Sequence, residues 1–387
     1  GPDKEKLQAS IDEMEKVIKD WDDRIKKMEK ELLALQDNAP AQPEYAMAVR
    51  EKSEPENCRI HIRGEIATLG ERVNRGNLRF LDLPNLKPAT DSASGRMQLA
   101  NWLASDRNPL TPRVFVNRVW QHLFGRGLVS TPDDFGKMGA RPSHPELLDH
   151  VAAEFVENGW SIKRLIRAIV SSRTYQLGSQ VSQVNQERDP ENVWLWRMKP
   201  RRLEVEPFRD SVMSISGQLD RTPFTGSVVA GFHLFKDVEF NSATKISGEQ
   251  MEIPHRSVYL PVVRGILPEM LDLFDFADPS SLVGTRDETT VPAQSLFLMN
   301  GEWIILQARA TAGRLLAETS WSDEERINWL FESAFGRLPA KSEIERLTGH
   351  LRVPEELLEA KADTSELEKW TSVCQTIIAS SELRFVR

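Results

Sequence analysis

The chain has 387 residues, more than one ordinary domain, which predicts two to three domains. Its 40% hydrophobic and 28% charged residues are typical of a globular protein, and a net charge of −8 argues against a nucleic-acid partner, which would need a basic face. No apolar run approaches the roughly 20 residues of a membrane span, and two cysteines exclude a disulfide scaffold or a four-cysteine metal site.

The first two residues, Gly1-Pro2, lack an initiating methionine, which is typical of the remnant of a cleaved expression tag. We therefore expect the sequence to be a fragment of a longer protein. The absence of a signal peptide then carries no information about where the parent protein resides.

Residues 1–39 are predicted to form a coiled-coil-like helix, because apolar residues alternate at spacings of four and three. The a and d positions are filled by Leu7, Ile11, Met14, Ile18, Trp21, Ile25, Met28, Leu32 and Leu35. Asn38-Ala39-Pro40 is expected to end the helix. The seam needs a partner, either a second copy in a homodimer through residues 7–35 or an antiparallel or docked helix. Trp21 at a d position fits a tight parallel dimer poorly.

Residues 40–90 are predicted to form a β-hairpin and a wrapping segment. Met47 and Val49 alternate with small or polar residues, 52–57 supply turn chemistry, and 58–63 alternate apolar with cationic side chains, so we place the hairpin at 46–63. The cationic row is either a solvated face or an anion-binding strip.

The rest of the chain divides into a helical subdomain at 91–217, a β- and loop-rich insertion at 218–290 and a C-terminal helical subdomain at 291–387. Residues 257–263 form an apolar β-like run, in which Pro261 favours an edge strand or an extended loop. The predicted fold is therefore mainly α: an N-terminal coiled-coil-like helix, then a multi-helix globular body with short β-hairpin elements.

Standard catalytic motifs are absent from the sequence. It contains no CxxCH, so the chain cannot attach haem covalently in the usual way, and pairing of Cys58 with Cys374 stays open. We expect no metal site, because His144 and His150, six residues apart on a helix, point to different faces.

Several stretches resemble the C-terminal domain of unknown function of large exported planctomycete-type proteins, over roughly residues 60–385. They include Asn108-Pro109-Leu110-Thr111-Pro112-Arg113-Val114-Phe115-Val116-Asn117-Arg118, Asp133-Asp134-Phe135-Gly136, Pro142-Ser143-His144-Pro145-Glu146, Arg201-Arg202-Leu203-Glu204, Arg256-Ser257-Val258-Tyr259-Leu260-Pro261, Phe274-Asp275-Phe276-Ala277-Asp278-Pro279 and Thr289-Thr290-Val291-Pro292-Ala293-Gln294. One departure is Val73-Asn74-Arg75-Gly76-Asn77-Leu78, where such proteins usually have proline and phenylalanine.

The resemblance implies a periplasmic or otherwise extracytoplasmic setting. It also implies upstream partner domains in the same polypeptide, one of them a c-type cytochrome module that carries haem c, and a role in polysaccharide utilisation. It supplies no catalytic residues.

Two hypotheses follow, and whether the domain is an enzyme stays open between them. In the first, a polar pocket takes part in oxidative or accessory processing, or binding, of acidic or sulfated glycans, since arginine binds carboxylate or sulfate in a bidentate manner. Its catalytic candidates are His144, Asp134 and Glu206, which could move protons, and its ligand-binding candidates are Arg202, Arg256, Arg264 and Asp287. In the second, the charges form interior salt bridges that tie loops to helices, and the domain is an interaction module that oligomerises or docks through its heptad helix.

Overall fold

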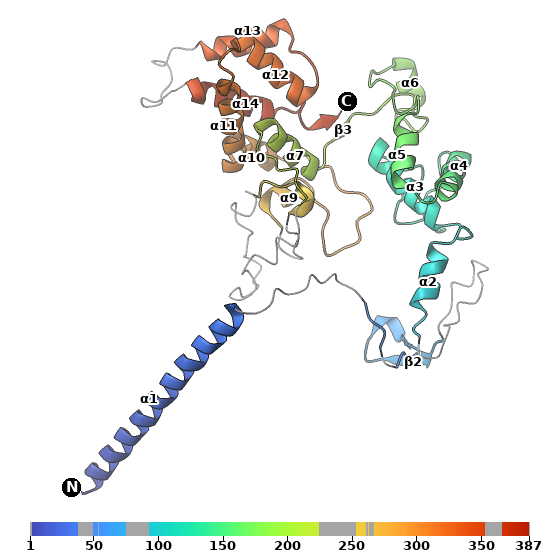
Figure 1. Cartoon of the computed structure of the whole chain (residues 1–387). Helices are drawn as coiled ribbons and strands as arrows, with labels where there is room; N and C mark the ends of the chain where they lie inside the picture. Colours follow the sequence, from blue (N-terminus) through green and yellow to red (C-terminus); the bar gives the residue numbers. More distant parts are fainter. Residues whose placement is uncertain are drawn as a thin grey trace. The chain divides into compact units, whose positions relative to one another are not determined.

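The computed structural model describes residues 2–37, 49–52, 54–74, 93–223, 253–260, 262, 267–352 and 366–386. It divides into two units, Gly1–Asn101 and Trp102–Arg387. Most of the described chain is helical, and the sheets within these ranges are two antiparallel pairs of short strands (Figure 1). The mainly α fold is confirmed, while the five-part division of the chain stays a prediction. None of the described helices is long and apolar enough to cross a membrane.

The first unit begins with helix α1 (Pro2–Asp37), which confirms the predicted N-terminal helix. Further along, strand β1 (Arg59–His61) pairs with β2 (Leu69–Arg72). Residues 46–48 of the predicted hairpin lie outside the described residues, and the expected partner residues 49–52 form no strand. The predicted strand at 58–63 instead pairs forward, with residues placed in the wrapping segment. The reason is local: a 3-10 turn, η1 (Ile62–Gly64), follows β1, and both Arg63 (φ 57°) and Gly64 (φ 81°) have left-handed backbones that reverse the chain there.

The second unit contains a first hydrophobic core built by α3 (Thr111–Phe124), α4 (Pro145–Glu157) and α5 (Ile162–Val170), with α6 (Gln183–Arg188) beyond them. Helix α2 (Arg96–Leu103) precedes these helices and spans the boundary between the units. Pro112 lies in the first turn of α3, and Gly125 ends the helix with φ +83°, the positions that these two residue types favour. Apolar faces at 3.6-residue spacing meet in the core, with Val116, Leu148 and Phe155 buried.

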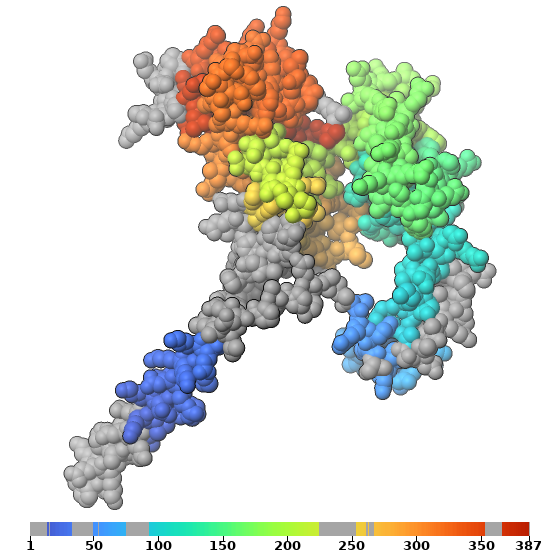
Figure 2. All heavy atoms as spheres, viewed as in Figure 1, coloured from blue at the N-terminus to red at the C-terminus, as the bar shows by residue number. Residues whose placement is uncertain are grey.

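A larger second core is formed by α7 (Val205–Ser216), α9 (Glu269–Leu273), α10 (Pro292–Asn300), α11 (Glu302–Ala317), α12 (Asp323–Phe335), α13 (Lys341–Leu351) and α14 (Glu366–Ala379). Figure 2 shows the C-terminal helices, orange to red, as one closely filled mass. Strand β3 (Arg201–Arg202) pairs with β4 (Phe385–Val386), which fixes the chain end beside the start of α7. Helices α10 and α11 are separated at Gly301, where a Cβ would lie 2.5 Å from the carbonyl oxygen of Phe297.

The predicted β-like run contains a 3-10 helix, η5 (Ser257–Tyr259), instead of a strand. Asp210 Oδ1 accepts hydrogen bonds from both the backbone nitrogen (2.7 Å) and the hydroxyl (2.6 Å) of Ser257. This side-chain contact with α7 curls the segment, and apolar composition alone could not reveal it.

Both cysteines are free thiols. Cys58 is exposed in the first unit, whereas Cys374 lies fully buried in α14, where burial raises the pKa of its thiol to about 12. Cys374 is thus an inert core residue.

Candidate functional site

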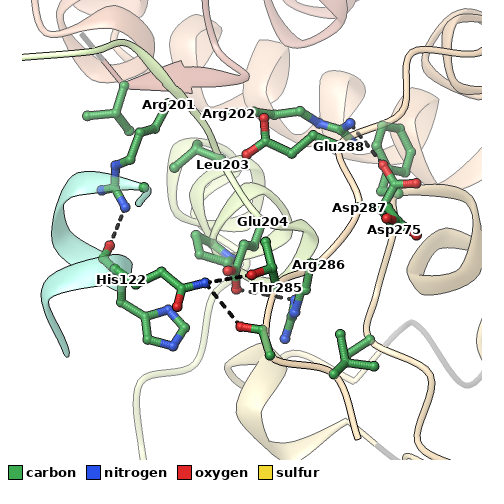
Figure 3. A pocket seen from close by; sticks show the side chains of 18 of the residues that line it. His122, Arg201, Arg202, Leu203, Glu204, Asp275, Thr285, Arg286, Asp287 and Glu288 are labelled. Carbon is green, nitrogen blue, oxygen red and sulfur yellow. Dashed lines mark hydrogen bonds and ion pairs between the residues drawn. The ribbon is translucent and has the colours of Figure 1, made fainter. Parts of the chain in front are cut away.

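A polar cleft of about 490 Å³ lies within the second unit. The end of α3, the segment from β3 to the start of α7, and residues 274–288 line it (Figure 3). Arginines and carboxylates dominate its wall: Arg118, Arg201, Arg202 and Arg286 against Glu204, Asp275, Asp287 and Glu288. Such a wall can both donate hydrogen bonds to a polar ligand and accept them from it.

Arg202 is bound to a carboxylate inside the protein. Its Nη1 donates to Asp275 Oδ2 at 2.9 Å and to the carbonyl oxygen of Thr289 at 2.5 Å, and its side chain is only 9% exposed. Asp275 also accepts from the Thr289 nitrogen and hydroxyl, at 3.0 and 2.7 Å. Arg202 therefore connects segment 275–289 to β3. The Asp275 carboxylate compensates the charge of Arg202 within the protein itself.

Arg286 and Arg118 are compensated in the same way. Arg286 binds Glu206 through two parallel bonds of 2.7 and 2.9 Å and lies 3.2 Å from a Glu204 oxygen. The hydrogen bonds that Arg286 donates to Glu206 raise the pKa of Arg286. Arg118 donates to Asp133 at 2.9 Å. Three of the cleft's four arginines thus hold protein carboxylates.

Arg201 differs from these three arginines. Its Nη1 donates to the carbonyl oxygen of His122 on α3, and among the described residues no carboxylate lies within ion-pair distance of it (Figure 3). Its Nε is buried without a hydrogen-bond partner in the described part of the chain. Two exposed carboxylates of the wall, Asp287 and Glu288, also have no ion-pair or hydrogen-bond partner among the residues described. The unpaired charges of the cleft are therefore one cation and two anions.

The cleft contains two of the predicted site residues, Arg202 and Asp287, and a third, Glu206, is joined to it through Arg286. His144 and Asp134 do not line it. His144 contacts Ser143 Oγ through Nδ1 at 2.9 Å and meets the ring of Trp194 edge-on. Asp134 accepts from the Gly136 nitrogen at 2.7 Å, which stabilises a local turn. The structure does not bring these two residues together with the arginines.

Of the other two predicted arginines, one lies outside the cleft and the other lies outside the described residues. Arg256 is 60% exposed, lies 3.7 Å from Asp210, and borders a separate, wider hollow of about 900 Å³ together with Glu206. Arg264 lies outside the described residues.

Sequence reasoning did not select Arg201, Arg286 or Asp275 as site residues. Arg201 and Asp275 stand in stretches that carry the family resemblance, so a signal existed. Nothing in the sequence marks Arg286, whose partner Glu206 lies 80 residues away.

We next consider whether the described residues could hold a metal ion or attach a haem. The described ranges contain no group of three or more side chains that could hold a metal ion. Covalent haem attachment would need two nearby cysteines and a histidine, and the two cysteines are 316 positions apart, one exposed and one buried. The two cysteines of the chain therefore do not fit a covalently attached haem.

Gly125 connects the end of α3 to Arg201. A Cβ at this position would lie 3.0 Å from Arg201 Cδ, and the positive φ disfavours any L side chain. We expect Gly125→Ala to lower the free energy of unfolding by about 1.5 kcal/mol, measured by urea denaturation. Gly159→Ala is the matched control, since Gly159 has φ +69° but nothing within 4 Å of its Cβ position. Equal losses in the two variants would contradict the contact with Arg201.

The family model of PSD1, described as a protein of unknown function (DUF1553), matches residues 95–351. The match confirms the resemblance to a domain of unknown function over that range. Neither a curated protein nor a solved structure matches the chain.

Proposed function

Because the chain belongs to the PSD1 family of proteins of unknown function, whose membership assigns no activity, we propose from the cleft that the domain binds a hydroxyl-rich ligand with a single anionic group. An oligosaccharide with one sulfate or one uronic acid has this chemistry. The proposal includes an extracytoplasmic setting and an upstream cytochrome module, both supported by the sequence resemblance. It concerns binding and involves no bond-making step.

The observation that carries the proposal is the uncompensated charge of Arg201. The Arg201 guanidinium uses one N–H group to donate to a backbone carbonyl oxygen. Its other N–H groups can donate to the oxyanion of a ligand in the cleft. Its neighbour Arg202 cannot serve, since Asp275 already occupies it. In this proposal Arg201 takes the anion-binding role, in place of Arg202, Arg256 and Arg264, which the sequence suggested.

Asp287 and Glu288 suit the rest of such a ligand, because carboxylates accept hydrogen bonds from sugar hydroxyls. The same two carboxylates repel additional anionic groups. We therefore expect a neutral or singly charged saccharide to bind better than a heavily sulfated one.

Calorimetric titration with a matched set of oligosaccharides (neutral, monosulfated and polysulfated) tests this proposal. Arg201→Met should weaken binding of the monosulfated member by about 10- to 100-fold, the value of one charge-assisted contact, and change the neutral member little. Asp287→Asn with Glu288→Gln should weaken the neutral member and improve the polysulfated one.

Arg173→Met is the control, since Arg173 is an exposed arginine outside the cleft. Thermal unfolding of each variant separates lost binding from lost folding. Equal binding of all three saccharides to wild type and to Arg201→Met would overturn the proposal.

A further inference from the structure

Helix α1 presents an apolar stripe to solvent. At its a and d positions six side chains are 45–62% exposed: Met14, Ile18, Trp21, Ile25, Met28 and Leu32. An apolar stripe at a 3.5-residue period along a 36-residue helix is the surface that a second helix covers in a coiled coil. We propose that α1 pairs with α1 of a second copy of this chain, in a parallel, in-register, two-stranded coiled coil.

The flanking charges determine the orientation. With Ile18 and Ile25 at a, the e positions carry Glu15, Asp22 and Glu29, all acidic, and the g positions carry Val17, Arg24 and Glu31. In a parallel pair each g residue faces the e residue five positions further on, so Arg24 meets Glu29 of the partner subunit, twice by symmetry. An antiparallel pair of copies sets g against g, where Arg24 can face Glu31, but it also sets e against e, where all three of these residues are acidic. The charge pattern therefore favours two copies in parallel.

The isoleucines within the stripe agree with two strands. β-Branched isoleucine at a is the choice that favours parallel dimers. Trp21 is the bulkiest d residue, and Arg24 already covers its ring, with the guanidinium carbon 5.6 Å from the ring centroid. Arg24 can thus shield the flank of the tryptophan and still carry the charge that faces Glu29 of the partner subunit.

Disulfide trapping in the full chain tests both the partner and the register. Cys58→Ser removes the exposed thiol, and Ile18→Cys in that background places one reporter cysteine at an a position. In a parallel, in-register dimer the two reporters face each other, so mild oxidation should give a covalent dimer on a non-reducing gel. Lys19→Cys, one residue outside the stripe, is the matched control. No covalent dimer from Ile18→Cys, or equal yields from both variants, would overturn the proposal.

Light scattering after size exclusion gives the second measurement. We expect a dimer for the full chain and a monomer for Ile18→Asp with Ile25→Asp, whose second unit should keep its thermal transition. Arg24→Glu should weaken dimerisation about fivefold at low salt, and Glu29→Arg added to it should restore the wild-type dissociation constant. A chain that stays monomeric at all concentrations, or that forms trimers or tetramers, would contradict the proposal.

Discussion

Replacing Arg209 by methionine is expected to lower the free energy of unfolding by about 3–5 kcal/mol, the largest effect that we predict for a single substitution. Arg209 lies on α7 and is fully buried. Burial lowers the pKa of its guanidinium to about 10, which still leaves it charged at neutral pH. A buried charge of this kind is tolerated only because it is bonded on several sides.

The partners of Arg209 explain the size of the expected effect. Its Nη2 donates to the carbonyl oxygen of Ile253 at 2.6 Å, and its Nη1 donates to that of His255 at 3.0 Å and to Ser257 Oγ at 3.3 Å. Asp210 lies 3.8 Å away. Methionine would fill much of the volume but would leave these acceptors unpaired in the protein interior. Segment 253–257 would then lose its main attachment to α7.

Urea denaturation of wild type and of Arg209→Met at neutral pH measures this effect. Arg256→Met is the matched control, because Arg256 belongs to the same segment but is 60% exposed, so its loss should change stability by less than about 0.5 kcal/mol. Arg209→Lys keeps the charge but not the forked donors and should fall between the two. A change below about 1 kcal/mol for Arg209→Met would contradict the structural role assigned to the bonds between Arg209 and segment 253–257.

The second large effect is expected at Arg337, which follows α12 and joins α13 to the chain after α14. Its guanidinium makes paired bonds of 2.9 Å to Glu343 and of 2.8 Å to Glu382, and it stacks over Phe331. The two carboxylates raise the pKa of Arg337. Because its side chain remains 37% exposed, solvent screening limits the effect, and we expect Arg337→Met to lose about 2 kcal/mol.

This cluster also gives the protein an acid dependence. The bonds from Arg337 and from the Ala340 nitrogen lower the pKa of Glu343 from 4.5 to about 2. A carboxylate with a lower pKa in the folded state stabilises the fold fully above its unfolded pKa, and this stabilisation disappears as the pH falls. Glu343 should therefore contribute to stability above about pH 4.5 and lose that contribution progressively between pH 4.5 and 2.

Denaturation midpoints between pH 2 and 7 test this dependence. Glu343→Gln should flatten the curve below pH 4.5, whereas Glu345→Gln, at an exposed position of the same helix, should leave it unchanged. If wild type and Glu343→Gln lost stability in parallel on acidification, the assignment to Glu343 would be wrong.

Local signals in the sequence predicted most helices of the fold well. Gly125 ends α3 and Ser161 caps α5, with its hydroxyl accepting from the Arg164 nitrogen, because both effects involve only neighbouring residues. The 3-10 helix at Ser257 escaped prediction. It depends on Asp210, which lies 47 residues away in the sequence.

The site was harder to predict than the helices, for a related reason. Arg201 and Arg202 are neighbours in the sequence, but adjacent side chains of a strand point to opposite sides. Arg202 forms an ion pair with Asp275, whereas Arg201 donates to a backbone carbonyl oxygen, so no carboxylate compensates its charge among the described residues. The sequence could indicate an arginine-rich pocket, but only the positions of these distant partners show which arginine is free for a ligand.

The most direct test of that assignment is to observe the Arg201 guanidinium itself by NMR, with its Nε–H signal identified by its loss in Arg201→Lys. Titration with the monosulfated oligosaccharide should shift this signal saturably and leave the Nε–H signal of Arg173 unchanged. The neutral analogue should shift it far less. If the Arg201 signal stayed in place while the oligosaccharide bound, or if no saccharide bound at all, the proposed anion-binding role of the cleft would be contradicted.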